Sequence, residues 1–153
     1  MIRLSRLADY GVLLMSYMAR EPDDVHTAIH LSENTRLPIP TVSKVLATLA
    51  RAGLLDSIRG RDGGYRLALP PKVISVEQII AAVDGPIALT VCLENDGAQC
   101  DFESICPSQP NWRRINEALC DALRGVSLWE ISTPTVMNLD PLSPFPTNVS
   151  DRT

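Results

Sequence analysis

Residues 37–68 read LPIPTVSKVLATLARAGLLDSIRGRDGGYRLA, and this stretch decides the fold. Its first half predicts a helix from Thr41 to Ala52, because apolar residues recur at helical spacing and Gly53 follows where a left-handed residue ends a helix. Its second half predicts a β-hairpin with strands over 54–59 and 65–68. The Asp-Gly-Gly run at 62–64 is expected to supply the positive φ angles that the hairpin turn requires.

Two further helices precede this stretch. Apolar periodicity predicts a first helix from about Ser5 to Arg20, and Thr27 is expected to cap a second helix that ends near Thr35. Arg36 stands in the turn between the second and third helices, where glycine is common, and is expected to adopt a left-handed conformation. A helix-turn-helix followed by a hairpin is a winged helix, so the predicted fold is mostly α with a small β-hairpin wing.

The distribution of charge favours DNA as a partner of this part of the chain. The net charge is −4, but residues 1–66 carry nine Lys/Arg against seven Asp/Glu, and the excess of acid lies after residue 66. Phosphate binding depends on where the cations lie rather than on their total. Polar residues at the start of the third helix and arginines at the hairpin tip are the candidate DNA contacts, namely Thr41, Ser43, Lys44, Arg59 and Arg61.

Cysteines mark a second candidate site. Cys92, Cys100 and Cys106 lie in one acidic segment with gaps of seven and five residues, long enough for the backbone to fold round one metal centre. Thiolates bind soft or borderline metals and hold iron–sulfur clusters. Burial as small apolar side chains, a structural disulfide and a zinc site are the alternatives, but acidic neighbours argue against a core and the absence of a secretory leader argues against a disulfide. The spacing favours an iron–sulfur cluster.

Several stretches together resemble the IscR-like winged-helix regulators, bacterial sensors of iron–sulfur status, iron and nitric oxide that include the IscR, NsrR and RirA types. The stretches are MIRLSRLADYGVLLM at the start, residues 37–68, the helix ISVEQIIAAVDGP and the cysteine segment, so the resemblance runs from Met1 to about Ile131. The continuation PSQPNWRRINEAL looks closest to regulators of the SUF iron–sulfur assembly operon.

The resemblance implies a homodimer with one cluster in each subunit near the dimer interface, held by Cys92, Cys100 and Cys106. The IscR type adds a histidine three residues after the last cysteine, but Gln109 stands there. The nitric-oxide-sensing type adds an aspartate from the first helix of the partner subunit, and Asp9 matches that place, although a solvated Asp9 is the plain alternative. Three thiolates and one oxygen favour a 4Fe–4S over a 2Fe–2S cluster. Cys120, inside a later helix, is expected to pack there.

The remaining chain is assigned by pattern. Residues 1–70 form the predicted winged helix-turn-helix DNA-binding domain, 71–131 a helix, the cysteine loop and a long C-terminal dimerisation helix, and 132–153 a disordered tail rich in Pro, Ser and Thr. Ser75 is expected to cap a helix from Val76 to Val83, and a helix over 111–126 carries an apolar stripe that suits an isologous dimer contact or packing against the first helix. The two histidines, His26 and His30, are expected on the second helix, facing solvent or a phosphate.

These features predict a cytoplasmic transcription regulator that binds double-stranded operator DNA and whose cluster sets its DNA affinity, repressing SUF genes. No apolar run could span a membrane, and no catalytic motif indicates an enzyme. Two other classes stay open: a zinc-stabilised winged-helix DNA-binding protein without a sensing role, and a thiol redox switch that uses the same cysteines without metal.

Overall fold

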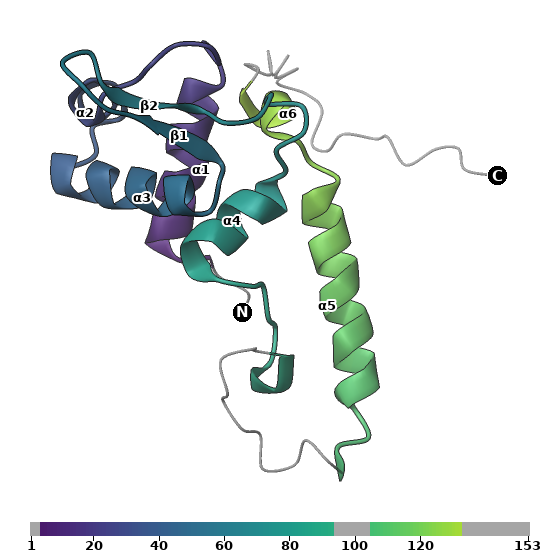
Figure 1. Cartoon of the computed structure of the whole chain (residues 1–153). Coiled ribbons are helices and arrows are strands. Elements are labelled where there is room, and N and C mark those ends of the chain that lie inside the picture. The colour runs from purple at the N-terminus through teal and green to yellow at the C-terminus, as the bar shows by residue number, and fades with distance from the viewer. Residues whose placement is uncertain (1–3, 94–104, 133–153) are drawn as a thin grey trace, which may run out of the picture.

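The computed structural model describes residues 4–93 and 105–132, which fold mostly into helices with one antiparallel hairpin (Figure 1). Three helices precede the hairpin and three follow it. In chain order the elements are α1 (Arg6–Met18), α2 (Ala28–Thr35), α3 (Ile39–Arg51), β1 (Leu55–Ile58), β2 (Gly64–Leu67), α4 (Val76–Asp84), a 3₁₀ turn (Val91–Leu93), α5 (Gln109–Arg124) and α6 (Leu128–Ser132). The predicted fold class, mostly α with a β-hairpin wing, is confirmed.

Side-chain caps explain where the helices begin. The Thr27 hydroxyl accepts a hydrogen bond from the His30 N–H at 3.1 Å, as predicted. Ser75 and Gln78 form a reciprocal capping box at the start of α4, which confirms Ser75 as its cap. Each cap satisfies N–H groups that the first turn of a helix leaves without a backbone partner.

The turn between α2 and α3 has the predicted left-handed residue. Arg36 lies at φ 59° and ψ 20°, and the Ser32 hydroxyl donates to the Leu37 carbonyl across the turn at 2.6 Å. Helix α3 begins at Ile39, two residues earlier than predicted, because Pro40 fits the first turn of a helix, where no N–H is needed. Gly53 follows its end at φ 80°, as expected.

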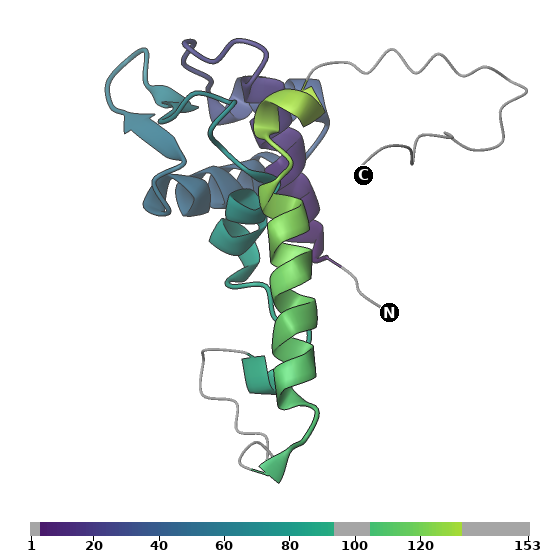
Figure 2. The ribbon, with the colours of Figure 1, turned by 90° about the vertical axis from the view of Figure 1, so that its right-hand side faces the viewer.

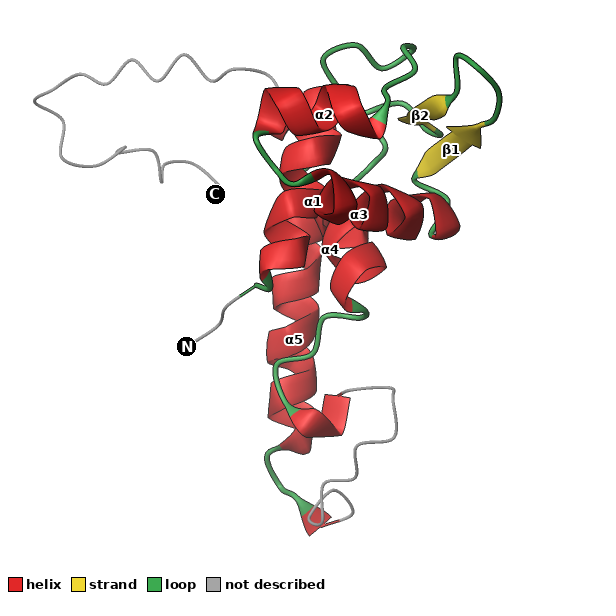
Figure 3. Ribbon diagram, turned by 90° about the vertical axis from the view of Figure 1, so that its left-hand side faces the viewer, coloured by secondary structure: helices red, strands yellow, loops and turns green. Residues whose placement is uncertain are grey.

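The core lies where α1, α3 and α4 meet. Leu14 and Met15 of α1 are fully buried against Leu46 and Leu49 of α3, and Ile79 of α4 joins the same cluster. These positions recur at helical spacing, so one stripe of each helix is removed from water and drives the folding. The core therefore holds α3 with its opposite, polar face outward, and Figure 3 shows α3 beside α1 and α4.

The wing differs from the prediction in how its glycines are used. Strands β1 and β2 form the predicted antiparallel hairpin, and their register places Asp56 opposite Arg66. The positive φ in the turn belongs to Gly60 (114°), so the expectation for the Asp-Gly-Gly run is wrong. Gly63 and Gly64 are needed for close approach instead, because a Cβ there would lie 2.5 Å from a carbonyl oxygen, that of Ile58 or His26 respectively.

His26 corrects a second expectation. It precedes α2 rather than lying on it, is only 2% exposed, and exchanges two backbone hydrogen bonds of 2.8 Å with Tyr65 of β2. It thus acts as a short third strand of the wing. Its ring packs against Tyr17 and stacks on His30, which is exposed on α2. His26 is buried, and not exposed as expected, because its backbone pairs with Tyr65. No pattern in the sequence indicated this pairing.

Helix α5 extends away from the winged helix, with the 3₁₀ turn beside its N-terminal half (Figures 1 and 2). It ends at Arg124, and α6 follows through a second capping box in which Ser127 and Glu130 pair. The hydrogen bonds from Ser127 hold the pKa of the Glu130 carboxyl below its ordinary value. Ser132, predicted as the first residue of the tail, is buried at the end of α6, and the rest of the predicted disordered tail lies outside the described residues.

Candidate nucleic-acid interface and metal centre

The candidate DNA contacts lie on one end of the molecule. Thr41, Ser43 and Lys44 occupy the first half of α3, and only Lys44 among them is fully exposed, while the two hydroxyl residues are half-buried. The opposite face of the helix carries the buried core residues, so the polar residues cannot turn inward. The start of α3 and the loop of the hairpin both lie on the left in Figure 1.

The hairpin loop presents two free cations. Arg59 and Arg61 are exposed, and neither forms an ion pair within residues 4–93 and 105–132. Arg66, by contrast, lies 3.9 Å from the Asp56 carboxylate across the two strands. An exposed guanidinium without a partner is available to a phosphate, so the geometry suits Arg59 and Arg61 better than Arg66 for that contact.

Two of the three clustered cysteines can be placed. Cys92 lies in the 3₁₀ turn and Cys106 lies three residues before α5; both are half-buried free thiols. The Thr90 hydroxyl lies 3.2 Å from the Cys92 sulfur, a hydrogen bond in which either atom can donate. Cys100, the third predicted ligand, lies outside the described residues. Sequence reasoning missed Thr90 and had no signal for it.

Cys120 differs from the other two described thiols. It lies on α5, half-buried, and its sulfur accepts a hydrogen bond from the Asn116 amide at 3.7 Å. Partial burial raises the pKa of the Cys120 thiol, and the carboxylate of Glu77 raises it further. A raised pKa disfavours the thiolate that a metal requires. This environment agrees with the expectation that Cys120 packs within the helix.

Asn116 is a second residue that sequence reasoning missed. Its side chain donates to the Ile87 carbonyl at 2.9 Å and accepts from the Leu89 N–H at 3.0 Å. The only available signal was an asparagine in the middle of a helix, where its propensity is low. The contact fastens the segment before the cysteine loop to α5.

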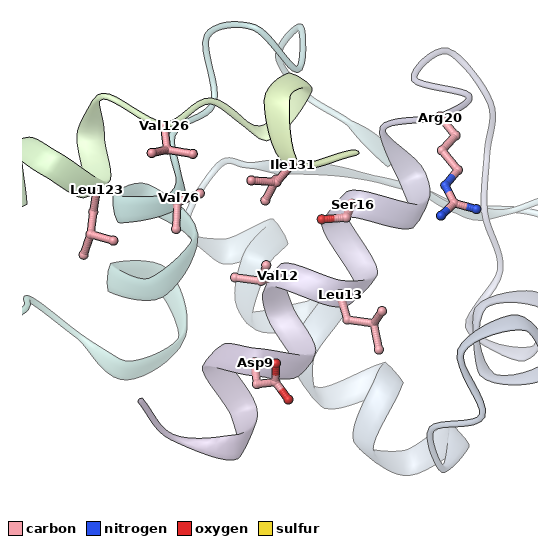
Figure 4. A pocket seen from close by; sticks show the side chains of 9 residues that line it. All are labelled: Asp9, Val12, Leu13, Ser16, Arg20, Val76, Leu123, Val126 and Ile131. Atoms are coloured by element: carbon pink, nitrogen blue, oxygen red, sulfur yellow. The ribbon is translucent and has the colours of Figure 1, made fainter. Parts of the chain in front are cut away.

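A groove along α1 contains the predicted fourth ligand. It measures about 550 Å³, and Asp9 lies on α1 at its edge, exposed to solvent (Figure 4). No cysteine of the described residues lines it. Most of the lining is apolar and comes from α1, α4, α5 and α6: Asp9, Val12, Leu13, Ser16, Arg20, Val76, Leu123, Val126 and Ile131.

Helix α5 carries an exposed apolar face beside this groove. On the helix, Trp112 is 41% exposed and Ile115 48% exposed, and Val126, in the loop that follows the helix, is also exposed. The helix also contacts α4, but none of its residues is buried. An exposed contiguous apolar face of this kind marks an interaction site in soluble proteins.

Within the described residues, no helix is long and apolar enough to cross a lipid bilayer.

Comparison with known proteins matches this architecture. The Rrf2 family model, described as an iron-dependent transcriptional regulator, matches residues 4–134. The HTH-type transcriptional regulator IscR of Vibrio cholerae is 32% identical over 131 residues, which are 85% of this chain and 75% of that protein. The IscR of Aliivibrio salmonicida is 34% identical over 101 residues, which are 66% of this chain but only 59% of that protein.

Solved structures add two similar folds. CymR of B. subtilis, a global cysteine regulator, superposes with a TM-score of 0.68 at 26% identity, covering 86% of this chain and 97% of that one. IscR of T. potens superposes with a TM-score of 0.64 at 25% identity, covering 85% of each chain. CymR of Staphylococcus aureus, also similar at 26% identity, has been solved in an oxidised form.

Proposed function

The chain belongs to the Rrf2 family of transcription regulators and is not an enzyme, and from this premise we propose that it is an iron–sulfur-cluster regulator that represses SUF iron–sulfur assembly genes according to cluster status. Such a protein acts in the cytoplasm, where the DNA lies. One observation carries the proposal: two free thiols, Cys92 and Cys106, flank the acidic segment at the base of α5, with the third cysteine, Cys100, between them.

The donor set fits a cluster. The residues that would hold it are Cys92, Cys100 and Cys106, with Asp9 of the partner subunit as the fourth ligand, and three thiolates with one oxygen favour 4Fe–4S over 2Fe–2S. The Thr90 hydroxyl can donate to the Cys92 sulfur once that sulfur is a thiolate. Hydrogen bonds to ligand sulfurs tune the stability and potential of such clusters. The cluster would be present or absent according to the supply of iron and the level of oxidants, and its occupancy would be the signal.

The exposed apolar surfaces support a homodimer. The apolar face of α5 and the groove along α1 are both exposed in a single chain, and both are contiguous and apolar. An isologous dimer would bury each against a second copy of the chain. Because Asp9 lies at the edge of the groove, the same contact would bring it toward the partner's cysteine segment.

The DNA-binding end would then be duplicated. In each subunit Thr41, Ser43 and Lys44 at the start of α3 would enter the major groove, and Arg59 and Arg61 of the wing would contact phosphates. In a dimer the two α3 helices must match half-sites about one helical turn apart, or a multiple of it. DNA affinity would therefore depend on the spacing between the two subunits.

Cluster binding can control that spacing. A cluster that joins Cys92 and Cys106 of one subunit to Asp9 of the other would fix α1, and α1 packs directly on α3. Loss of the cluster would release this link and weaken operator binding. The cluster shifts the equilibrium only by as much as it prefers the DNA-binding arrangement.

A thiol switch is the second candidate function. The observation that favours it is the similarity to CymR, which has a structure in an oxidised form, together with free thiols in this chain. In this case oxidation of the same cysteines, without metal, would change DNA affinity.

An anaerobic absorbance spectrum of freshly purified protein, with iron, sulfide and zinc measured on the same sample, separates these functions. Iron and acid-labile sulfide near four per subunit are the expected result. A colourless protein that remains colourless after reconstitution with iron and sulfide would contradict the cluster. In that result, stoichiometric zinc would indicate a structural metal site, and metal-free protein that forms disulfides in air would indicate the thiol switch.

A further inference from the structure

The side-chain amide of Asn116 forms hydrogen bonds with backbone groups, as the backbone of a neighbouring β-strand would. Its amide nitrogen donates to the Ile87 carbonyl and its amide oxygen accepts from the Leu89 N–H, so one side chain satisfies two backbone groups of the same segment. Asparagine is a poor residue for a helix interior, and this pairing explains its place better than helix propensity does. The pair joins the middle of α5 to backbone 27 to 29 residues earlier in the chain.

The clamped segment leads directly to a cysteine. Three residues after Leu89 comes Cys92, and the turn between them is closed by a hydrogen bond of 2.9 Å from the Leu93 N–H to the Thr90 carbonyl. The Thr90 hydroxyl then contacts the Cys92 sulfur at 3.2 Å. Hydrogen bonds therefore hold residues 87–89 on α5, and the backbone from Leu89 to Thr90 connects them to the contact with that sulfur.

The second described cysteine is tied to the same helix. Cys106 precedes α5, and its carbonyl accepts a hydrogen bond of 3.4 Å from the N–H of Gln109, the first residue of the helix. Both cysteines are thus positioned relative to α5, Cys106 through the chain itself and Cys92 through the side chain of Asn116. Figures 1 and 2 show the 3₁₀ turn lying against the N-terminal half of this helix.

We propose that Asn116 is a positioning residue for the metal centre: it holds residues 87–89 on α5 and so sets Cys92 relative to Cys106 before any metal binds. The inference rests on the proposed function for the identity of the metal group. Ligands that the protein already holds in place lose less conformational freedom on binding, and residues that orient ligands change metal affinity about 10- to 100-fold when they are replaced.

Asn116→Ala, compared with Asn111→Ala, tests the proposal. Asn111 is an exposed asparagine on the same helix, so its replacement makes the same truncation without touching residues 87–89. In metal-free protein, amide hydrogen exchange of the peptide spanning residues 86–93 is expected to quicken about tenfold or more in Asn116→Ala only. In reconstituted protein, an iron chelator is expected to bleach the cluster about 10- to 100-fold faster in Asn116→Ala.

Asn116→Asp provides a second variant that keeps the acceptor for the Leu89 N–H but replaces the donor to the Ile87 carbonyl. Its exchange and bleaching rates are expected between those of wild type and Asn116→Ala, and the visible circular dichroism of its cluster should differ from wild type. Thermal unfolding of both variants checks that α5 is intact.

Unchanged exchange over residues 86–93 in Asn116→Ala would overturn the clamp, whatever the spectrum. Faster exchange with an unchanged bleaching rate would overturn the positioning role. Failure of the proposed function is distinguishable from both, because a wild-type protein that takes up no cluster is recognised by its spectrum before any variant is compared.

Discussion

Cysteine side chains in this protein occupy two different chemical environments. Cys92 faces a hydroxyl that can donate to a thiolate, whereas the thiol of Cys120 is desolvated and has a raised pKa. The raised pKa of the Cys120 thiol disfavours the thiolate that metals bind. The candidate ligands and the packing cysteine are therefore separable by mutation.

Replacing Cys92 or Cys106 by alanine is expected to abolish cluster retention, because two remaining thiolates cannot hold it. Cys120→Ala serves as the matched control and should keep iron and sulfide at the wild-type level. Metal analysis after anaerobic gel filtration measures both. Retention in Cys92→Ala, or loss in Cys120→Ala, would show that the ligand set is wrongly assigned.

Arg59 tests the wing. Arg59→Ala should weaken binding to operator and random DNA by the same factor, since a phosphate contact carries no sequence information. It should also reduce the magnitude of the negative slope of log affinity against log salt by about 0.9. Fluorescence anisotropy at several salt concentrations measures this. Lys72→Ala, an exposed cation beyond the end of β2, should leave the slope unchanged. A selective loss for the operator alone would contradict a phosphate contact.

Residue roles set by nearby sequence could be predicted, and those set by distant partners could not. Thr27 as a cap and Arg36 as a left-handed residue depend on neighbours a few positions away. Asn116 takes its role from backbone 27 residues distant or more, and His26 from Tyr65 on a strand that forms later in the chain. No local pattern carries such information.

At the scale of elements, the two-stranded hairpin of the wing has one further backbone partner, the single residue His26. The backbone pair between His26 and Tyr65 fastens it to the chain before α2, and the glycine at 64 is required because a Cβ there would meet the His26 carbonyl. The sequence predicted the two long strands from their alternation and turn residues. A one-residue strand has no periodicity to detect.

Gly64→Ala is expected to lower the free energy of unfolding by about 1–3 kcal/mol, because the added methyl group forces backbone to shift. Gly125→Ala is the control, since a Cβ there meets its nearest atoms at 3.4 Å and the residue is already right-handed helical. Denaturant unfolding followed by circular dichroism compares the two. Equal stability of both variants would contradict the close approach of Gly64 to the His26 backbone.

Helix α5 is the element for which the sequence indicated a partner. Its apolar stripe was expected to face a second copy or the first helix, and in the structure Trp112 and Ile115 remain exposed. The helix itself runs from Gln109 to Arg124, so it begins and ends two residues earlier than predicted. It ends early because the Ser127 capping box starts α6, and Pro110 suits its first turn.

Ile115→Asp is expected to raise the dissociation constant of the proposed dimer roughly 10- to 100-fold, since burying an isoleucine contributes about 1.5–3 kcal/mol. Because Ile115 is 48% exposed in the single chain, the monomer should stay folded. Arg113→Asp adds a carboxylate to the same helix off the stripe and serves as the control. Sedimentation velocity measures both; a dimer that survives Ile115→Asp would place the interface elsewhere.

In the whole molecule, the candidate DNA contacts and the two described cysteines of the candidate metal centre, Cys92 and Cys106, lie at opposite ends. The start of α3 and the wing stand on one side of the core, and the 3₁₀ turn with Cys92 lies beside the far half of α5 (Figures 1 and 3). The proposed cluster at Cys92 and Cys106 would lie away from bound DNA and would act through the helices between. The proposed contact with Asp9 of the partner's α1 would provide a route, because α1 packs on α3.

The sequence carried this global plan in part. Hydrophobic periodicity and turn residues determine the winged helix, so its fold could be predicted. The proposed coupling between the two ends involves a second chain, and no local pattern in the sequence specifies how two chains would pair. The operator sequence likewise depends on side chains such as Thr41 and Ser43 meeting bases in a complex.

The most direct test of the account measures the affinity of anaerobic, cluster-loaded protein and of cluster-free protein for one DNA fragment that the loaded protein selects from genomic DNA, by fluorescence anisotropy at one salt concentration. If the cluster controls DNA binding, the loaded form should bind about 5- to 150-fold more tightly, the usual range of coupling between two sites. Equal affinity of the two forms would contradict the claim that the cluster controls DNA binding.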